Sequence, residues 1–218
     1  MKLVIMAGGY GTRLRPYTEI IPKILLSYRG KSMLEVILER YKPEKTYIIA
    51  RHKHTLIKNY VMMLNINAEV IVETEELGTA GGLSLLSEDE YLLTNCDIIY
   101  DGDIKGFISL CKKENATLGL ISFQKTIPIH YGVLDFDSTG ELIGMREKPE
   151  LKIWCNAGIY YITPDIIKSI RGKKNMDEVI FDSLNTGNNI TVYPIAEEEY
   201  HDIGTFENLR KELGYEIF

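Results

Sequence analysis

The sequence predicts an α/β fold: a Rossmann-like, mostly parallel sheet flanked by helices, with a smaller β-rich lobe. Short apolar runs alternate with segments of helical period through the first half of the chain. A glycine-rich loop follows the first apolar run, and after Asp97 the alternation gives way to a series of extended segments. Because strand–helix–strand alternation implies right-handed crossovers, the first half should form parallel strands with helices on both faces of the sheet.

Four short apolar runs in the first half predict buried strands. They are Leu3–Met6, Thr46–Ala50, Ala68–Val72 and Tyr91–Thr94. Segments of helical period lie between them at Ser32–Arg40, His54–Leu64 and Ala80–Ser87. The first of these helices also has a start signal, because Ser32 with Glu35 three residues later matches a capping box. Ligands of such sheets bind at the carboxyl ends of the strands, where the glycine loop and Asn95–Asp97 both fall.

The second half is expected to contain the β-rich lobe and further helices. Extended segments are predicted at Thr117–Phe123, Gly132–Phe136, Leu142–Glu147, Ile153–Ile162 and Thr191–Ile195. Helices are predicted at Ile104–Lys112, Pro164–Ile170, Met176–Leu184 and Phe206–Leu213. An Asp-Ser-Thr-Gly turn at residues 137–140 separates the second and third extended segments and predicts a hairpin there.

The composition of the 218-residue chain fits a single enzyme-sized domain that we expect to be cytoplasmic. A net charge of −6 does not indicate the positively charged surface that nucleic acid binding requires. Cys96, Cys111 and Cys155 follow no metal-ligand spacing, so we expect buried thiols in a reducing compartment. The apolar run Leu3–Ala7 is too short for a signal peptide or a membrane span. We therefore expect neither a nucleic acid nor a membrane partner, and a monomer or a homodimer.

Residues 8–18 form a glycine-rich, basic loop for which three phosphate-binding patterns compete. A dinucleotide fingerprint would need a third glycine where this chain has Leu14. A Walker loop that ends at residues 30–32 would need a glycine where this chain has Leu25. The third pattern is Gly-Gly-X-Gly-Thr-Arg-Leu-X-Pro-X-Thr followed by Pro-Lys. Residues 8–18, with Pro22 and Lys23, match it at every fixed position.

With this loop, the sequence resembles the sugar-1-phosphate nucleotidylyltransferases, and in particular the mannose and heptose 1-phosphate guanylyltransferases. Further segments match that family in order along the whole chain. The segment Glu73–Gly82 is similar to its base-reading loop, and Asn95–Asp97 and Asp202–Thr205 are similar to its two metal segments. Residues 131–133, 147–149 and 156–160 are similar to its sugar-phosphate-binding segments. Such an ordered set of matches is far more specific than any one of them.

The resemblance implies a fold of the nucleotide-diphospho-sugar transferase type, with one catalytic domain over residues 1–218. Residues 1–125 would bind the nucleotide, and residues 126–218, with the β-rich lobe, would bind the sugar phosphate. In the implied reaction, a sugar 1-phosphate attacks the α-phosphorus of a nucleoside triphosphate in line, Mg²⁺ assists, and pyrophosphate leaves. Because the nucleophile is already ionised, the reaction requires charge neutralisation and alignment and no general base.

Four charged residues would carry this chemistry. By resemblance, Arg13 holds the β- and γ-phosphates and Lys23 holds the α-phosphate. Asp97 and Asp202 are the implied ligands of Mg²⁺, which prefers carboxylate, phosphate and water oxygens. Simpler interpretations are a solvated arginine, a strand-edge lysine, a helix N-cap for Asp97 and a turn aspartate for Asp202. The matching segments favour the functional set, in which Arg13, Lys23 and Asp97 are catalytic.

Other matched positions imply contacts with the two substrates. The nucleotide would lie against Ala7, Gly8, Gly9, Gly11, Thr12, Glu73, Gly78 and Thr79. The sugar phosphate would lie against Gly132, Glu147, Lys148 and Asn156. Of these, Glu147 is expected to accept hydrogen bonds from sugar hydroxyls and Lys148 to bind the phosphate, although an exposed charge pair is the simpler interpretation.

The identity of residue 73 bears on the choice of base. Family members that use UTP or dTTP typically have glutamine five residues before the loop glycine, where this chain has Glu73 ahead of Gly78. A carboxylate only accepts hydrogen bonds, which suits the N1–H and N2–H₂ edge of guanine. We therefore favour GTP with a mannose- or heptose-like sugar. The alternatives are a cytidylyltransferase acting on phosphocholine or a similar phosphate, and a non-catalytic sugar-nucleotide-binding subunit.

Four positions depart from the family pattern. Ile24 and Glu76 replace prolines, Cys96 replaces a glycine, and His201 stands where an aromatic or apolar residue is usual. None of these departures removes a charge that the reaction requires. Since regulatory subunits usually lose the arginine, the lysine or an aspartate, the retained charges favour an enzyme.

Overall fold

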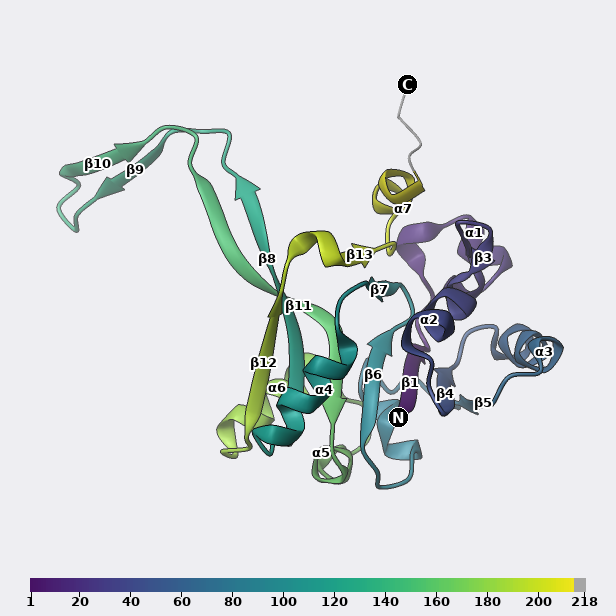
Figure 1. Cartoon of the computed structure of the whole chain (residues 1–218). Helices are drawn as coiled ribbons and strands as arrows, with labels where there is room; N and C mark the ends of the chain where they lie inside the picture. The colour runs from purple at the N-terminus through teal and green to yellow at the C-terminus, as the bar shows by residue number, and fades with distance from the viewer. Residues whose placement is uncertain (214–218) are drawn as a thin grey trace.

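The computed structural model describes residues 1–213, and within them the main sheet has seven strands (Figure 1). Their order is β12 (Ile190–Ile195), β8 (Leu118–Pro128), β11 (Glu150–Ile162), β6 (Tyr91–Asn95), β1 (Lys2–Ala7), β4 (Lys45–Ala50) and β5 (Ala68–Val72). Neighbouring strands run parallel except at β11, which is antiparallel to both β6 and β8. The predicted mostly parallel α/β sheet is therefore confirmed.

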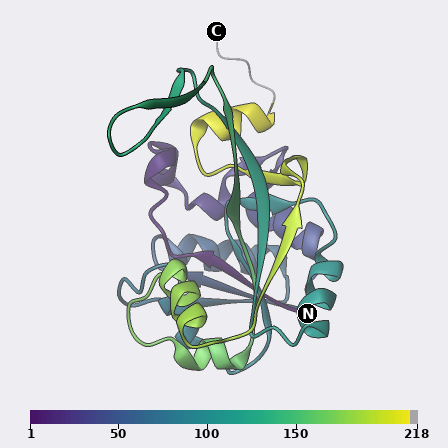
Figure 2. The same ribbon diagram turned by 90° about the vertical axis from the view of Figure 1, so that its left-hand side faces the viewer.

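Helices cover both faces of this sheet, as the turned view shows (Figure 2). One face packs against α2 (Met33–Tyr41), α3 (His54–Leu64) and α4 (Ile104–Lys113). The other packs against α5 (Pro164–Ser169) and α6 (Met176–Asn185). The buried strand β1 serves both cores, because Leu3 and Ile5 join the first cluster and Val4 joins the second. In the described residues, no helix is long and apolar enough to cross a membrane.

The local signals for α2 are confirmed in detail. The Ser32 hydroxyl accepts a hydrogen bond from the Glu35 amide at 3.2 Å, and the Glu35 carboxylate accepts one from the Ser32 amide at 2.8 Å. This is the predicted capping box, which satisfies two amides that the helix itself leaves unpaired.

The predicted helix Ala80–Ser87 is wrong, because the chain forms only a short 3₁₀ helix at Gly81–Leu85. The amides of Ala80 and Gly81 donate to the Lys174 carbonyl at 2.9 and 3.0 Å, so tertiary contacts satisfy the start of this segment. Two consecutive glycines also lower its helix propensity. Contacts with the loop that contains Lys174 therefore determine the conformation of this segment, and its own apolar pattern does not.

The β-rich lobe takes the form of an arm (Figure 1). Strands β8 and β11 continue beyond the sheet as a two-stranded ribbon, and the hairpin of β9 (Val133–Phe136) and β10 (Leu142–Arg146) follows at its far end. The predicted turn is present, since the Asp137 carboxylate accepts from the amides of Thr139 and Glu141 at 2.8 and 3.0 Å. Strand β8 crosses the boundary between residues 125 and 126, so the assignment of one substrate to each half stays a prediction.

Small elements link the carboxyl edge of the sheet to the end of the described chain. Strand β7 (Ile98–Tyr100) pairs with β13 (Tyr200–Asp202), and helix α7 (Phe206–Leu213) follows. The other short α-helix and strands of the described chain are α1 (Tyr17–Ile20), β2 (Ser27–Tyr28) and β3 (Lys31–Ser32), and a 3₁₀ helix at Glu197–Glu199 precedes β13. The β7–β13 pairing places Asp202 opposite Ile98, the residue after Asp97. The two predicted metal segments are therefore neighbours in space.

Candidate active site

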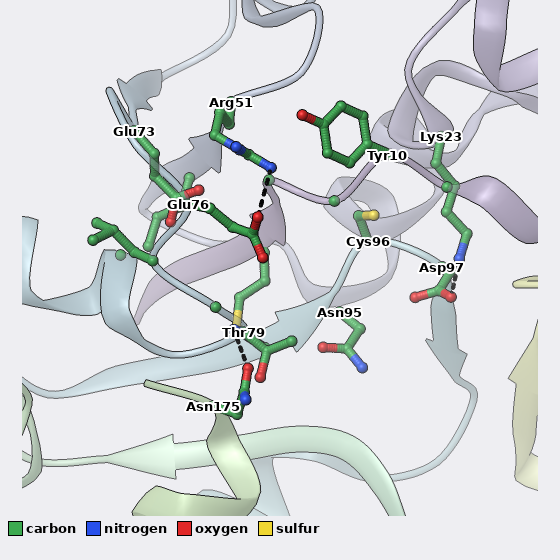
Figure 3. A pocket seen from close by; sticks show the side chains of 18 of the residues that line it. Tyr10, Lys23, Arg51, Glu73, Glu76, Thr79, Asn95, Cys96, Asp97 and Asn175 are labelled. Atoms are coloured by element: carbon green, nitrogen blue, oxygen red, sulfur yellow. Dashed lines mark hydrogen bonds and ion pairs between the residues drawn. The ribbon is translucent and has the colours of Figure 1, made fainter. Parts of the chain in front are cut away.

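A cavity of about 510 Å³ opens at the carboxyl ends of β1, β4 and β6 (Figure 3). Ten of the residues predicted from the sequence line it: Gly8, Gly9, Gly11, Thr12, Arg13, Lys23, Glu73, Gly78, Thr79 and Asp97. Ala7 is the buried last residue of β1, directly before this lining. The structure thus brings the predicted nucleotide side of the site into one cavity.

The glycine loop turns sharply after β1. Gly11 has φ +63°, a left-handed conformation that other residues adopt only with strain. The Thr18 hydroxyl donates to the Gly11 carbonyl at 2.9 Å, and a Cβ on Gly11 would lie 2.8 Å from the Thr18 methyl group. The next turn is the 3₁₀ helix Thr12–Leu14, which Leu14 anchors in the core while Arg13 faces the cavity. The glycine loop therefore lines the cavity with its backbone and with Arg13.

Lys23 and Asp97 form an ion pair in the cavity, with only 11% of each side chain exposed (Figure 3). Lys23 begins a 3₁₀ helix, Lys23–Leu25, whose Ile24 is buried in the core. Asp97 follows β6 and leads into β7. The N-cap interpretation of Asp97 is therefore wrong, because no helix starts there, and the strand-edge interpretation of Lys23 is also wrong.

Asp202 completes a charged group around Gly204. A Cβ on Gly204 would lie 2.6 Å from an Asp97 carboxylate oxygen, 2.8 Å from an Asp202 carboxylate oxygen and 3.1 Å from Lys23 Nζ. The Asp202 carboxylate accepts hydrogen bonds from the Gly204 amide at 2.6 Å and from Asn208 Nδ2 at 3.2 Å. Two carboxylates from distant parts of the chain thus meet beside the cavity lysine.

This pair of carboxylates fits a hard divalent cation. Such an ion takes oxygen ligands and keeps positions for substrate phosphates and water. Among residues 1–213, no cluster of three or more histidine, cysteine or acidic side chains offers a closed metal site. Because the Asp97 and Asp202 carboxylates alone leave coordination positions open, they match a divalent cation that binds together with a phosphate ligand.

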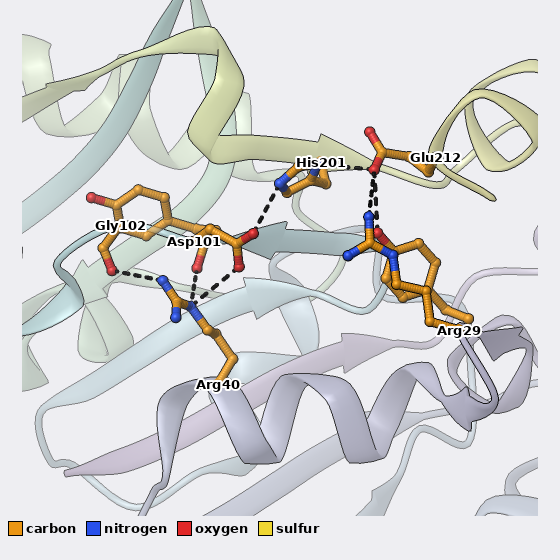
Figure 4. A network of polar contacts seen from close by, with 8 residues as sticks. Arg29, Arg40, Asp101, Gly102, His201 and Glu212 are labelled. Carbon is orange, nitrogen blue, oxygen red and sulfur yellow. Dashed lines mark hydrogen bonds and ion pairs between the residues drawn. The ribbon is translucent and has the colours of Figure 1, made fainter. Parts of the chain in front are cut away.

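A polar network around His201, the residue before Asp202 in the chain, explains the departure at His201 (Figure 4). The two ring nitrogens of His201 lie 2.9 Å from the Glu212 carboxylate on α7 and 3.1 Å from the Asp101 carboxylate. Arg40 of α2 lies 3.4 Å from Asp101 and donates to the Tyr100 carbonyl at 2.8 Å. The network joins β13 to α7 and to the end of β7, and so holds the backbone next to Asp202.

Substitution of Gly204 by alanine is expected to weaken metal use while leaving the fold intact. The new Cβ would displace the Asp97 and Asp202 carboxylates, which are flexible side-chain ends and can move. By analogy with changes that reorient metal ligands, the metal concentration for half-maximal activity should rise about 10- to 100-fold. Gly144→Ala is the matched control, since its Cβ would meet nothing closer than Asp135 at 3.9 Å. An unchanged metal titration for Gly204→Ala would contradict this role of the glycine.

Glu73 lies at the opposite end of the cavity from Lys23 and is 6% exposed. Its carboxylate sits between Gly8 and Gly82, where a Cβ on either glycine would clash with it. Burial raises the pKa of Glu73, and the positive charge of Arg51 partly opposes that rise. No residue that the structure describes donates a hydrogen bond to this carboxylate. Its acceptor positions are therefore available to a ligand in the cavity.

The loop after Glu73 is fixed by the start of α6. The Thr79 amide donates to Asn175 Oδ1 at 3.2 Å, and the Met176 amide donates to the Thr79 hydroxyl at 2.9 Å. Asn175 was not predicted from the sequence as a cavity residue. It is the N-cap of α6, and its backbone amide donates to the Glu178 carboxylate at 2.6 Å, but no local pattern shows that it would contact Thr79. Arg51, Tyr10, Glu76 and Asn95 also line the cavity without having been predicted as site residues.

The predicted sugar-phosphate residues are not brought to this cavity. Gly132 and Glu147 are neighbours on the arm, where a Cβ on Gly132 would lie 3.1 Å from a Glu147 carboxylate oxygen. Lys148 follows Glu147 in an exposed turn and has φ +43°. Asn156, nearer the base of the arm, donates to the Tyr160 hydroxyl at 2.8 Å. The roles of these four residues stay predictions.

The base of the arm does reach the cavity rim through Gly158. The register of β11 against β8 shifts between Asn156 and Tyr160, and Gly158 has φ +73°. A Cβ on Gly158 would clash with the amide of Asn95, a lining residue. This irregularity requires glycine and lies beside the cavity.

A family model described as "Nucleotidyl transferase" matches residues 2–214. The chain belongs to the nucleotidyl transferase family. The resemblance inferred from the motifs is thereby confirmed. Enzymes of the nucleotidyl transferase family generally use a divalent metal ion, which agrees with the paired carboxylates.

Curated relatives of this nucleotidyl transferase chain include mannose-1-phosphate guanylyltransferase 1 of Arabidopsis thaliana. It is 29% identical over 187 residues, which cover 78% of this chain and 52% of that protein. Mannose-1-phosphate guanyltransferase of Yarrowia lipolytica is 31% identical, covering 78% of this chain and 51% of that protein. The Saccharomyces cerevisiae enzyme of the same name is also 31% identical, with 79% and 53% covered. The chain thus spans about half the length of these relatives.

Solved structures confirm the fold class. A putative glucose-1-phosphate thymidylyltransferase from Bacillus anthracis has a TM-score of 0.75 and 20% identity, covering 100% of this chain and 97% of that one. HddC from Yersinia pseudotuberculosis, solved with GMP-PN, has a TM-score of 0.72 and 23% identity, with 98% of both chains covered. At these identities the likeness establishes the nucleotidyl transferase fold alone.

Proposed function

We propose that this chain joins GTP to a sugar 1-phosphate, giving a GDP-sugar and pyrophosphate. One observation carries the choice of base: a buried carboxylate, Glu73, has unpaired acceptors at the end of the cavity opposite Lys23 and Asp97. Guanine presents paired N1–H and N2–H₂ donors to such a group. The names of the relatives support guanylyl transfer and make mannose 1-phosphate the first sugar to test, with a heptose 1-phosphate second.

The side chains of the cavity suit this reaction without a general base. We assign the β- and γ-phosphates to Arg13 and the glycine-loop amides, which would hold the leaving pyrophosphate. Lys23 would lie at the α-phosphate, where negative charge develops during in-line attack. Asp97 and Asp202 would hold Mg²⁺, which supplies charge neutralisation and alignment of the phosphate oxygens. These groups together would overcome the repulsion between two anionic substrates.

Pyrophosphate release across a substrate matrix tests the proposal. The purified chain would be assayed with Mg²⁺, the four common NTPs and dTTP, each with mannose 1-phosphate, a heptose 1-phosphate, glucose 1-phosphate and phosphocholine. We expect GTP to give the highest kcat/KM, and Mg²⁺ removal to abolish release. A preference for CTP with phosphocholine would favour the cytidylyltransferase alternative. Nucleotide binding without turnover would favour a regulatory subunit, and either result would overturn the proposal.

Replacement of Lys148 by alanine is expected to raise the KM for the sugar 1-phosphate and leave the KM for GTP unchanged. A lysine–phosphate contact is worth about 10- to 100-fold in affinity. Lys152→Ala on strand β11 is the matched control, because this lysine is also exposed on the arm. Initial rates at saturating GTP, measured against sugar-phosphate concentration, separate the two constants. Equal KM values for Lys148→Ala and its control would remove Lys148 from the sugar site.

We also infer a cytoplasmic location, supported by three free cysteines within residues 1–213. Burial raises the pKa of the Cys96 and Cys111 thiols to about 12, so they are protonated at neutral pH. The expectation of a monomer or a homodimer, without nucleic acid or membrane partners, stays a prediction that sedimentation analysis would test.

A further inference from the structure

Arg51 is a cavity residue that the sequence patterns did not single out. It is the first residue after β4, and its side chain is 23% exposed. Its guanidinium carbon lies 4.9 Å from the centre of the Tyr10 ring, and Nη2 lies 3.9 Å from a Glu76 carboxylate oxygen (Figure 3). The ring and the carboxylate hold the guanidinium at the same end of the cavity as Glu73.

Tyr10 and Glu76 orient the Arg51 guanidinium, but its N–H donors are still available for hydrogen bonds. A separation of 3.9 Å from Glu76 is an ion pair without a hydrogen bond. Within residues 1–213, Arg51 donates no side-chain hydrogen bond to the protein. Glu76 is shared, since Lys173 Nζ donates to its other oxygen at 3.1 Å. An arginine presents five N–H donors in a planar fork, so this one retains donors for a ligand.

Arg51 and Glu73 therefore place a donor group and an acceptor group side by side in one cavity. Guanine has the matching arrangement: N1–H and N2–H₂ donate, and the adjacent O6 and N7 accept. Arginine paired with O6 and N7 is the common guanine contact in nucleic acid recognition. Adenine has an amino group in place of O6, and would set a donor against the guanidinium.

We propose that Arg51 is a specificity-determining residue that donates hydrogen bonds to O6 and N7 of guanine while Glu73 accepts from N1–H and N2–H₂. The inference rests on the proposed use of GTP, and it adds Arg51 to Glu73 as a second residue that recognises the same base. It also gives Tyr10 and Glu76 a function, which is to hold the guanidinium in place from two sides. The competing interpretation is that Arg51 serves only the ion pair with Glu76.

Two GTP analogues distinguish the proposed contact of Arg51 from the proposed contact of Glu73. 7-Deaza-GTP lacks the N7 acceptor, and ITP lacks the N2 amino group. With the wild-type chain, we expect kcat/KM to fall about 10-fold for 7-deaza-GTP, the effect of one lost charged hydrogen bond, and by a similar factor for ITP. In Arg51→Met, GTP and 7-deaza-GTP should become equal within about twofold, while the preference for GTP over ITP persists. Arg210→Met on α7 is the matched control and should retain both preferences.

The outcomes also distinguish this inference from the proposed function. If the wild-type chain does not use GTP, the proposed function fails before any variant is compared. If GTP is the substrate but Arg51→Met retains the wild-type preference for GTP over 7-deaza-GTP, Arg51 does not read N7 and the inference is wrong. If Arg51→Met lost the preference for GTP over both 7-deaza-GTP and ITP, the base would no longer bind in the proposed orientation, and the inference would also be wrong. Calorimetric affinities for GTP and 7-deaza-GTP, with melting curves of each variant, give a readout that is independent of turnover.

Discussion

Asp97→Asn is expected to lower kcat by about 10³-fold, because it removes one of the two carboxylates that we propose hold Mg²⁺ at the reacting phosphates. The asparagine side chain has nearly the same shape, and its amide oxygen can still accept a hydrogen bond from Lys23. Folding should therefore be largely retained, although the lysine loses the charge that compensates its burial. The metal concentration for half-maximal activity should rise in parallel, because Asp202 would be left as the single charged ligand.

The measurement combines pyrophosphate release over a Mg²⁺ titration with thermal unfolding of each variant. Asp89→Asn is the matched control: its carboxylate pairs with Lys2, at the start of β1 and so at the end of the strand away from the cavity. We expect this control to retain wild-type kcat and metal dependence. If Asp97→Asn turned over at the wild-type rate, the carboxylate would have a structural role and the proposed metal site would be wrong.

The fold was predictable where each signal is local. The strand β1 is an apolar run, α2 has its own capping pair, and the glycine loop requires φ +63° at Gly11. Such signals depend on residues a few positions apart, so the sequence contains them in full. The rule that ligands bind at the carboxyl ends of parallel strands then predicted which of these segments would meet.

The parts that could not be predicted depend on contacts between distant segments. Gly81–Leu85 does not become an α-helix because its first amides pair with the Lys174 carbonyl, which no local pattern reveals. Asn175 reaches Thr79 for the same reason. Arg51 is an intermediate case: it directly follows a correctly predicted strand, so the carboxyl-end rule could have found it. Its ion pair with Glu76, a residue that departs from the family pattern, could be found only from the structure.

Glu73→Gln is expected to lower kcat/KM for GTP by about 10²- to 10³-fold and to raise the relative use of UTP and dTTP. A buried site built to accept two hydrogen bonds loses much of its selectivity when one acceptor becomes a donor that opposes N1–H or N2–H₂. Uracil and thymine present a carbonyl beside an N–H, and a glutamine amide matches that pair. Stability should not fall, because burial raises the pKa of Glu73 and so disfavours the charged form that the neutral amide replaces.

Glu69→Gln is the matched control for this change, since Glu69 lies on strand β5 and pairs with Lys45 at the surface. It should retain the wild-type preference among the nucleoside triphosphates. The decisive quantity is the ratio of kcat/KM for GTP to that for UTP, because a general loss of activity would lower both equally. If this ratio were the same in Glu73→Gln and in the wild type, the buried carboxylate would not face the base. The base would then be selected elsewhere, and the argument from Glu73 to GTP would fail with it.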